Sequence, residues 1–259
     1  MGRLTEHSAA RAAAARGRVR ELEQGVASLV PAVSFRDALR RDSVAVIAEI
    51  KRRSPSKGVL DDALSAAERS AQYEAGGAAA LSILTEPSEF GGSLDDLASA
   101  RAAVALPLLR KDFIVDEVQL LEARVAGASA VLLIARALPA DRVFALAAMA
   151  RSIGLDVLLE VRDESELERA LGVPNGVLGV NNRNLETLQM DDAVSERLLR
   201  LVPPDRTAVY ESGVRDVEGV RRAAALGADA VLVGSALSVA SSPTDAVRQL
   251  TRVPRSARG

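Results

Sequence analysis

The 259-residue sequence contains no cysteine, no tryptophan and a single histidine, His7. The lack of cysteine excludes disulfide bonds and thiolate metal sites. One histidine near the start of the chain argues against a histidine-rich metal site and leaves Glu, Asp and Lys for general acid and base catalysis. We therefore expect no metal site, and we expect carboxylates and lysines to be the reactive groups of any enzyme built from this chain.

The sequence also lacks long apolar runs and an excess of positive charge. No apolar run approaches the roughly 18 residues of a membrane span, and arginines interrupt the N-terminal segment where a signal peptide would lie. The 33 basic and 35 acidic residues leave a net charge of -2, so there is no general basic surface for nucleic acid. We expect a cytoplasmic protein that binds neither membranes nor nucleic acid, and the sequence does not identify protein partners.

Aliphatic residues are abundant and recur in a regular pattern. Hydrophobic residues make up 48% of the chain and aromatic residues only 2%, so the core must consist of Ala, Val, Leu and Ile. Eight short apolar runs are each followed by a charged or glycine-rich loop and then by an Ala-, Leu- and Arg-rich stretch typical of a helix. The runs occupy residues 44–50, 79–85, 106–112, 130–135, 156–161, 176–182, 207–212 and 230–235.

Strands that alternate eight times with helices predict parallel pairing through right-handed crossovers. Eight such units close a (β/α)8 TIM barrel, and we predict one barrel domain over residues 1–259, with residues 1–42 as an N-terminal extension of two or three helices. The alternative is an open doubly wound sheet. It is disfavoured because the loop after the first run lacks the glycine-rich nucleotide turn of that fold.

The first run ends at two opposite charges, Glu49 and Lys51. Residues two apart on a strand point to the same face, and it is costly to bury such a pair without very good geometry. The pair is therefore either a structural ion pair or the floor of a site. We expect residues 54–58, which follow it, to form a loop over that site.

Polar residues follow six of the eight runs. In a barrel the C-terminal ends of the strands meet at one rim, which carries the functional groups. Each residue alone is more often a helix cap or a solvated loop residue, but together they bring two lysines, three glutamates and two arginines to this rim. They are Glu49, Lys51, 110–112, Glu160, 181–184, 211–213, Gly234 and Ser235.

Small residues stand at the ends of the last two runs. They are Ser212 and Gly213 at one end and Gly234 and Ser235 at the other. Their backbone N–H groups can approach an anion closely, and phosphate sites in this fold recur at these two loops. A tight turn alone would explain either pair. The two pairs together predict a phosphate site.

Lys51, Lys111 and Glu160 are the candidates for acid and base catalysis. Burial and mutual charge can lower the pKa of a lysine or raise the pKa of a glutamate toward neutral pH. One lysine could instead form a Schiff base, which also requires a lowered pKa.

Several stretches together resemble the indole-3-glycerol phosphate synthase family. They are IAEIKRRSPSKG (47–58), FGGSLDDL (90–97), LPLLRKDFIVDEVQL (106–120), LLEVRDESELERAL (158–171), GVNNRNLETL (179–188), ESGVRD (211–216) and GADAVLVGSAL (227–237). Related phosphate-binding barrels share only the last two stretches. The resemblance implies that 1-(2-carboxyphenylamino)-1-deoxyribulose 5-phosphate loses CO2 and water to give indole-3-glycerol phosphate, without a metal or organic cofactor.

The resemblance also implies roles for individual residues. Lys111 looks like the general acid, Glu160 like its acid/base counterpart in dehydration, and Lys51 like the group that binds the substrate carboxylate and serves as a second acid. The remaining implied site residues are the catalytic Glu49, Asn181 and Glu211, the substrate-binding Ser54, Phe90, Phe113, Arg183 and Leu185, and the phosphate-binding Ser212, Gly213, Gly234 and Ser235. Leu132 is a further candidate for the wall around the anthranilate ring, although Leu132 and the other wall residues could equally be ordinary core residues.

Two residues depart from the family pattern. Tyr210 stands before Glu211 where a smaller residue is usual, and we expect it to crowd the end of its strand; Asn184 replaces a more common Asp. The alternatives to this function are another phosphate-binding barrel enzyme, such as phosphoribosylanthranilate isomerase or the tryptophan synthase α subunit, and a non-catalytic phosphate-binding paralogue. Neither enzyme uses the two lysines with Glu49 and Glu160, and loss of a lysine would have indicated the paralogue.

Overall fold

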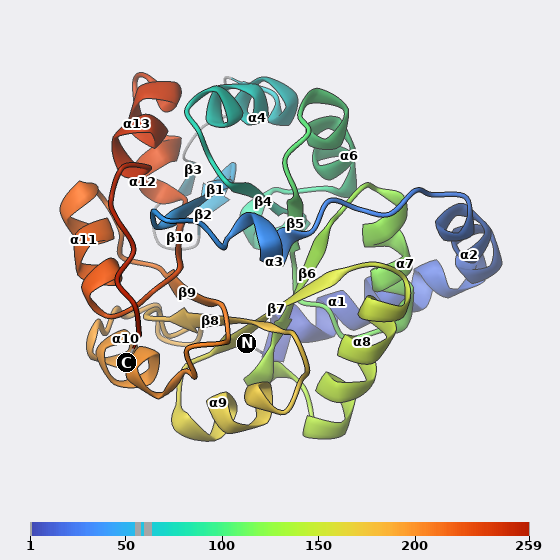
Figure 1. Cartoon of the computed structure of the whole chain (residues 1–259). Coiled ribbons are helices and arrows are strands. Elements are labelled where there is room, and N and C mark those ends of the chain that lie inside the picture. The colour runs from blue at the N-terminus through green and yellow to red at the C-terminus, as the bar shows by residue number, and fades with distance from the viewer. Residues whose placement is uncertain (1, 55–57, 60–63, 259) are drawn as a thin grey trace.

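A computed structural model describes residues 2–54, 58, 59 and 64–258, without the side chains of Ser54 and Val59. Eight parallel strands close into a barrel in the order β1-β10-β9-β8-β7-β6-β5-β4, with helices around it (Figure 1). The strands are β1 (Ala45–Ile50), β4 (Ala80–Leu84), β5 (Leu108–Lys111), β6 (Ala130–Ile134), β7 (Asp156–Val161), β8 (Val177–Asn181), β9 (Ala208–Glu211) and β10 (Ala230–Val233). Each predicted run contains one of these strands, so the TIM barrel is confirmed. The open doubly wound sheet is wrong because β1 pairs with both β4 and β10.

Helices begin and end at the signals that the sequence contains. The Ser93 side chain accepts a hydrogen bond from the Asp96 N–H at the start of α6, and Asp163 accepts one from the Glu166 N–H at the start of α9. The helices of the barrel are α4 (Ala66–Ala75), α5 (Pro87–Phe90), α6 (Leu94–Ala103), α7 (Glu117–Val125), α8 (Ala140–Ser152), α9 (Glu164–Leu171), α10 (Ala193–Leu198), α11 (Val217–Ala225), α12 (Ser235–Ser238) and α13 (Pro243–Leu250). Short 3-10 helices occupy Arg16–Arg18, Ala135–Ala137 and Leu199–Leu201. No helix in the described part of the chain is long and apolar enough to cross a membrane.

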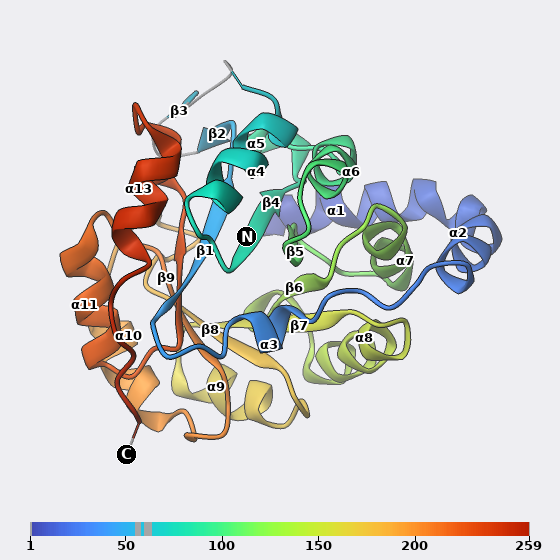
Figure 2. The same ribbon diagram turned by 45° about the horizontal axis from the view of Figure 1, so that its top comes forward.

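Three helices precede β1, as the sequence predicts: α1 (Gly2–Ala15), α2 (Val19–Ala27) and α3 (Phe35–Ala38). Figure 2 shows α1 and α2 beside α7, and Ala12 and Leu22 bury their side chains there against Val118 and Leu121. Phe35, on α3, is completely buried in the same cluster as the inward-facing residues of the strands. The N-terminal segment therefore covers both the outside of the barrel and the end opposite the rim.

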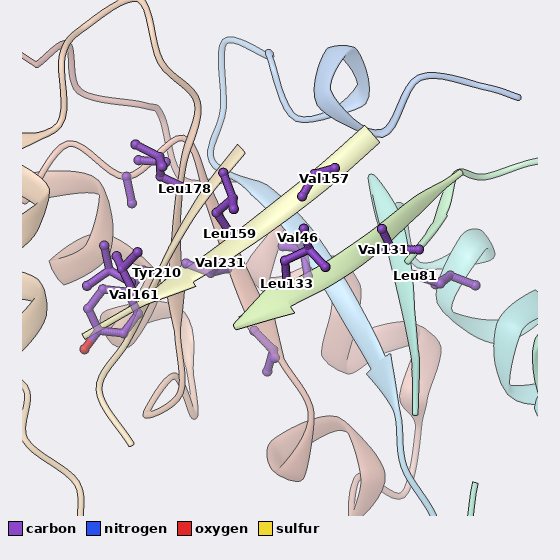
Figure 3. Close-up of a cluster of buried hydrophobic side chains, with 14 of the residues drawn as sticks. Val46, Leu81, Val131, Leu133, Val157, Leu159, Val161, Leu178, Tyr210 and Val231 are labelled. Atoms are coloured by element: carbon purple, nitrogen blue, oxygen red, sulfur yellow. The ribbon is translucent and has the colours of Figure 1, made fainter. Parts of the chain in front are cut away.

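The alternation of each strand divides its apolar side chains between two cores. Inward residues such as Ile47, Leu132 and Leu158 fill the barrel. Outward residues such as Val46 and Leu159 pack under the helices (Figure 3). The inward position nearest the C-terminal end of each strand is therefore the one that faces the rim.

A short antiparallel pair, β2 (Arg53–Ser54) with β3 (Gly58–Val59), follows β1. The sequence did not predict it, because strands of two residues leave no periodic pattern. Part of the loop expected at 54–58, residues 55–57, lies outside the described residues.

Candidate active site

One cavity of about 710 Å³ opens at the rim formed by the C-terminal ends of the strands. The predicted site residues that line it are Glu49, Lys51, Phe90, Lys111, Phe113, Glu160, Asn181, Arg183, Leu185, Glu211, Ser212, Gly213, Gly234 and Ser235. The Ser54 side chain lies outside the described part of the structure, so its role stays a prediction. Every other predicted site residue reaches this cavity, although the residues are spread over almost 190 positions of the sequence.

Lys51 and Glu49 form the predicted same-face pair. Lys51 Nζ donates a hydrogen bond to Glu49 Oε1 at 2.7 Å, and both side chains are largely buried. Gly234, directly after β10, faces them: a Cβ atom there would lie 2.3 Å from Glu49 Oε1 and 3.1 Å from Lys51 Nζ. The ion pair occupies the space that a side chain at position 234 would need, which is a reason for glycine that the sequence could not reveal.

Lys111 enters the cavity from β5 and lies between two carboxylates. Its Nζ is 3.2 Å from Glu160 Oε2 on β7 and 3.2 Å from Glu211 Oε2 on β9. The three strands contribute inward-facing positions at the same height of the barrel. The geometry allows a proton to pass between the ammonium and either carboxylate without a large movement.

The prediction of a lysine with a lowered pKa is wrong for Lys111. Burial on its own lowers the pKa of this ammonium. The charges of Glu211 and Glu160, with a smaller contribution from Glu49, outweigh burial and hold the pKa above its ordinary value. Lys111 is therefore protonated at neutral pH, which suits a general acid and argues against a Schiff base.

Glu211 is the glutamate whose pKa is raised. Burial is the largest cause and, opposed by Lys111 but assisted by the charges of Glu160 and Glu49, raises the pKa of Glu211 to about 7. Glu211 Oε1 is buried without a hydrogen-bond partner among the described residues, which is an expected position for a proton. Gly179 makes room for this oxygen, since a Cβ atom at position 179 would lie 2.0 Å from it.

Asn181 links the end of β8 to the turn after β9. Its Oδ1 accepts a hydrogen bond from Ser212 Oγ at 2.9 Å and another from the Arg183 N–H at 2.9 Å. Ser212 has a φ of 67°, a left-handed conformation that is rare for residues other than glycine, and Gly213 follows with a φ of 94°. Such backbone geometry is maintained where it serves a site, and here it turns the chain at the predicted phosphate end.

Apolar side chains form one wall of the cavity. Phe113 and Leu132 are buried in the interior core, and Phe90 and Leu185 pack against that core while remaining partly exposed. All four also line the cavity. These four residues therefore belong to the core and also line the cavity. The two interpretations that the sequence left open, a wall around the ring and an ordinary core, do not exclude each other.

The loop after β8 contributes cavity residues that sequence reasoning missed. Leu188, Met190 and Asp192 line the cavity, and the Arg183 guanidinium donates to the Leu188 carbonyl oxygen at 3.0 Å. Arg215 and Arg222, which follow β9, lie at the exposed edge. These residues stand several positions beyond the strand ends, where sequence alone does not indicate which way a loop folds.

The two departures from the family pattern are accommodated. Tyr210 is buried on the outer side of β9, in the core of Figure 3, and its side chain leaves the strand opposite to Glu211. Its hydroxyl lies beside Asn182 and Asp192 at the end of the strand, so the expected crowding of that end stays a prediction. Asn184 Oδ1 accepts hydrogen bonds from the N–H groups of Glu186 and Thr187, as an aspartate in a turn does.

The described residues include no group of three or more His, Cys, Asp or Glu side chains that could hold a metal ion. The charged side chains that line the cavity include two lysines and three glutamates.

Solved structures share this fold at low sequence identity. The chain superposes on 3-hexulose-6-phosphate synthase from Salmonella typhimurium with a TM-score of 0.64 and 15% identity, over 80% of this chain and 96% of that one. Thiamine phosphate pyrophosphorylase from Pyrococcus furiosus gives a TM-score of 0.60 and 16% identity, over 82% and 95%. These similarities concern the fold alone.

Sequence relatives are far more similar. Indole-3-glycerol phosphate synthase 2 of Streptomyces coelicolor is 48% identical over 230 residues, which are 89% of each chain. Indole-3-glycerol phosphate synthase of a Nocardioides species is 49% identical over 233 residues, 90% of each chain. The family model for indole-3-glycerol phosphate synthase matches residues 1–250. The chain therefore belongs to the indole-3-glycerol phosphate synthase family.

Proposed function

We propose that the cavity closes the indole ring of 1-(2-carboxyphenylamino)-1-deoxyribulose 5-phosphate. A ring carbon that carries the carboxylate bonds to the ribulose carbonyl carbon, CO2 leaves, and the resulting hydroxyl departs as water to give indole-3-glycerol phosphate. The observation that carries the proposal is the arrangement of Lys111 between Glu160 and Glu211, in one cavity with the Lys51–Glu49 pair.

Lys111 is the acid that protonates the carbonyl oxygen as the new carbon–carbon bond forms. A buried ammonium held protonated by neighbouring carboxylates suits this task, because it stabilises the developing oxyanion in a site of low dielectric constant. Glu160, 3.2 Å from the same nitrogen, acts as acid and base in the loss of water. Glu211 carries a proton near neutral pH and adds a second group that exchanges protons with Lys111.

Lys51 binds the substrate carboxylate and is available as a second acid. In the free protein Lys51 holds Glu49 as its partner, and an incoming carboxylate can share that ammonium. Glu49 orients Lys51 and stabilises positive charge that develops on the substrate nitrogen. Ser54 remains a proposed further contact to the carboxylate.

The ends of the substrate fit opposite sides of the cavity. Phe90, Phe113 and Leu185 form a wall for the aromatic ring. The turns at Ser212–Gly213 and Gly234–Ser235 offer backbone N–H groups to the phosphate, with Arg183 nearby. No step requires a metal ion or an organic cofactor, and we place the enzyme in the cytoplasm.

The proposal is tested by assaying the purified protein with the carboxyphenylamino ribulose phosphate and following indole fluorescence. We expect turnover that survives prior dialysis against a chelator. Absence of product with folded protein would contradict the proposed reaction, and loss of turnover after chelation would contradict cofactor-free catalysis.

A further inference from the structure

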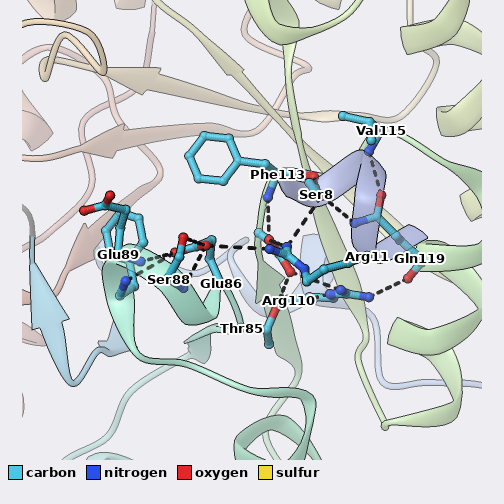
Figure 4. Close-up of polar contacts among 12 residues, drawn as sticks. Ser8, Arg11, Thr85, Glu86, Ser88, Glu89, Arg110, Phe113, Val115 and Gln119 are labelled. Atoms are coloured by element: carbon cyan, nitrogen blue, oxygen red, sulfur yellow. Dashed lines mark hydrogen bonds and ion pairs between the residues drawn. The ribbon is translucent and has the colours of Figure 1, made fainter. Parts of the chain in front are cut away.

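Arg11 on helix α1 bridges two buried carboxylates, Glu86 and Asp112, which follow two neighbouring strands (Figure 4). Arg11 Nη2 donates to Asp112 Oδ1 at 2.6 Å, and Arg11 Nη1 lies 3.6 Å from Glu86 Oε1. Asp112 follows β5 directly and Glu86 lies just after β4. One guanidinium from the N-terminal helix thus joins the ends of two neighbouring strands.

Asp112 fixes the chain next to Lys111. Its carboxylate is 2% exposed and accepts hydrogen bonds from the Thr85 hydroxyl at 2.8 Å, the Phe113 N–H at 2.8 Å and Arg110 Nη2 at 3.0 Å. Burial acts to raise the pKa of Asp112, but Arg110 and Arg11 hold it below its ordinary value. These contacts hold the Asp112 carboxylate in place. Because adjacent residues of an extended chain point to opposite faces, the position of Asp112 determines where the Lys111 side chain enters the cavity.

Glu86 fixes the segment that carries Phe90. Its carboxylate is completely buried and accepts hydrogen bonds from the N–H groups of Ser88, Glu89 and Phe90, which form the first turn of α5. Arg3 of α1 also pairs with Glu89. The position of the Phe90 ring therefore depends on a carboxylate whose charge Arg11 balances.

Helix α1 is fastened to the same wall at a second point. Ser8 Oγ donates a hydrogen bond to the Phe113 carbonyl oxygen and accepts one from Gln119 Nε2 at 2.8 Å (Figure 4). Leu4 packs against the apolar cluster that contains Phe90 and Phe113. These contacts hold the Arg11 guanidinium at the junction of β4 and β5.

We infer that Arg11 is a positioning residue for catalysis, which sets the Phe90 wall and the Lys111–Phe113 segment at their working distance by bridging Glu86 and Asp112. The inference rests on the proposed function of Lys111 and Phe90. Arg11 itself is absent from the lining of the cavity, so its effect must pass through these two carboxylates.

Removal of Arg11 leaves Glu86 and Asp112 buried without the cation that they share. Asp112 keeps its pair with Arg110, but one guanidinium no longer balances both carboxylates, so the strand ends must move apart or a carboxylate must take up a proton. A displacement of about 1 Å at a catalytic group can cost about 10²-fold in rate.

The test compares Arg11→Met with Arg11→Lys and with Arg16→Met. Arg16 is the matched control, because it also joins the N-terminal segment to the barrel, through Asp116 at 2.7 Å, but on the outer side at the start of α7. We expect Arg11→Met to lower kcat about 10- to 100-fold and to raise KM, since both Lys111 and the ring wall shift. Arg11→Lys should recover part of kcat because its ammonium can pair with one carboxylate at a time. Arg16→Met should stay within about twofold of the wild type, as expected for an exposed pair.

Equal kcat and KM for Arg11→Met and Arg16→Met, both folded at the assay temperature, would overturn the inference. Amide hydrogen exchange of the substrate-free proteins gives a second readout that needs no turnover. Arg11→Met should increase exchange at residues 86–90 and 111–114, whereas Arg16→Met should not, and unchanged protection there in Arg11→Met would also overturn the inference. A wild type without turnover would contradict the proposed function, while the exchange experiment would still decide whether Arg11 fixes the two segments.

Discussion

Lys51 and Lys111 enter one cavity from the ends of β1 and β5, which are separated by one strand, β4, and they are about equally buried, with 13% and 15% of their side chains exposed. Their partners differ. Among the described residues, Lys51 pairs with one carboxylate, at 2.7 Å, whereas Lys111 lies between two carboxylates at 3.2 Å each. Since burial is the same, the arrangement of the carboxylates must distinguish the two lysines.

This difference in carboxylate partners suits Lys51 for binding an anion and Lys111 for proton transfer. A lysine with one close partner forms a neutral pair, which can accept a substrate carboxylate by sharing its ammonium hydrogens. A lysine between two carboxylates keeps its proton, and one of its partners, Glu211, has a pKa of about 7 and so gains and loses its proton near neutral pH. Under the proposed function, Lys51 binds the substrate carboxylate and Lys111 donates the proton.

Lys111→Ala should produce the largest effect on turnover. We expect kcat to fall about 10³- to 10⁴-fold, because a general acid is lost, while substrate binding remains measurable by fluorescence titration. Near-normal turnover would show that Lys111 is not the acid.

Lys51→Met should weaken binding more than it slows the chemical step. Loss of a charged hydrogen bond to the substrate carboxylate should lower kcat/KM about 10- to 100-fold, mainly through KM. Steady-state kinetics beside Lys111→Ala provides the comparison. If Lys51→Met changed kcat alone and to the same extent as Lys111→Ala, the two lysines would have equivalent roles.

Gly234→Ala tests whether the Lys51–Glu49 pair needs the space at position 234. The added methyl group would meet Glu49 Oε1 at 2.3 Å, so the carboxylate must move, and we expect kcat to fall about 10-fold together with a rise in KM. A glycine required only for phosphate would affect KM and leave kcat unchanged. Measuring both constants over a range of substrate concentrations distinguishes these cases.

Glu211→Gln should change the pH dependence of stability. Between pH values near 4.5 and 7 the folded protein keeps a proton on Glu211 that the unfolded chain has released. The contribution of Glu211 to the free energy of unfolding of the wild type is therefore lost as the pH rises toward 7. Glutamine cannot ionise. Relative to wild type, the variant should therefore gain roughly 1 to 3 kcal/mol in free energy of unfolding between about pH 5 and pH 8.

Urea unfolding at the two pH values measures this difference, with Glu186→Gln as the control at an exposed glutamate. A constant difference between Glu211→Gln and wild type would show that Glu211 does not bind the proton.

The sequence predicted the barrel and almost the whole rim, because both depend on local patterns. Buried parallel strands appear as apolar runs, and the polar residue that ends each run faces the rim whatever the rest of the chain does. Glu49, Lys111 and Glu160 could therefore be assigned to one site before any distance was known.

What the sequence did not predict depends on distances between elements. The direction of the Lys111 pKa follows from how many carboxylates surround it, and they come from three other strands. Position 234 needs glycine because the side chain of Glu49, on β1, occupies the space beside it. Arg11 bridges Glu86 and Asp112, which lie about 75 and 101 positions further along the sequence. The outward direction of Tyr210 did follow from alternation with Glu211, and could have been deduced from the sequence.

The attachment of α1 to β5 has a consequence for the order of folding during synthesis. Ser8 and Phe113, which share a hydrogen bond, are separated by 105 positions, so α1 leaves the ribosome long before its docking site exists. At about 5 to 20 residues per second this delay is on the order of 5 to 20 seconds. Helix α1 therefore waits with Ala12 uncovered until the first three strands of the barrel and α7 have emerged, and a nascent chain that stops before β5 holds α1 without this partner.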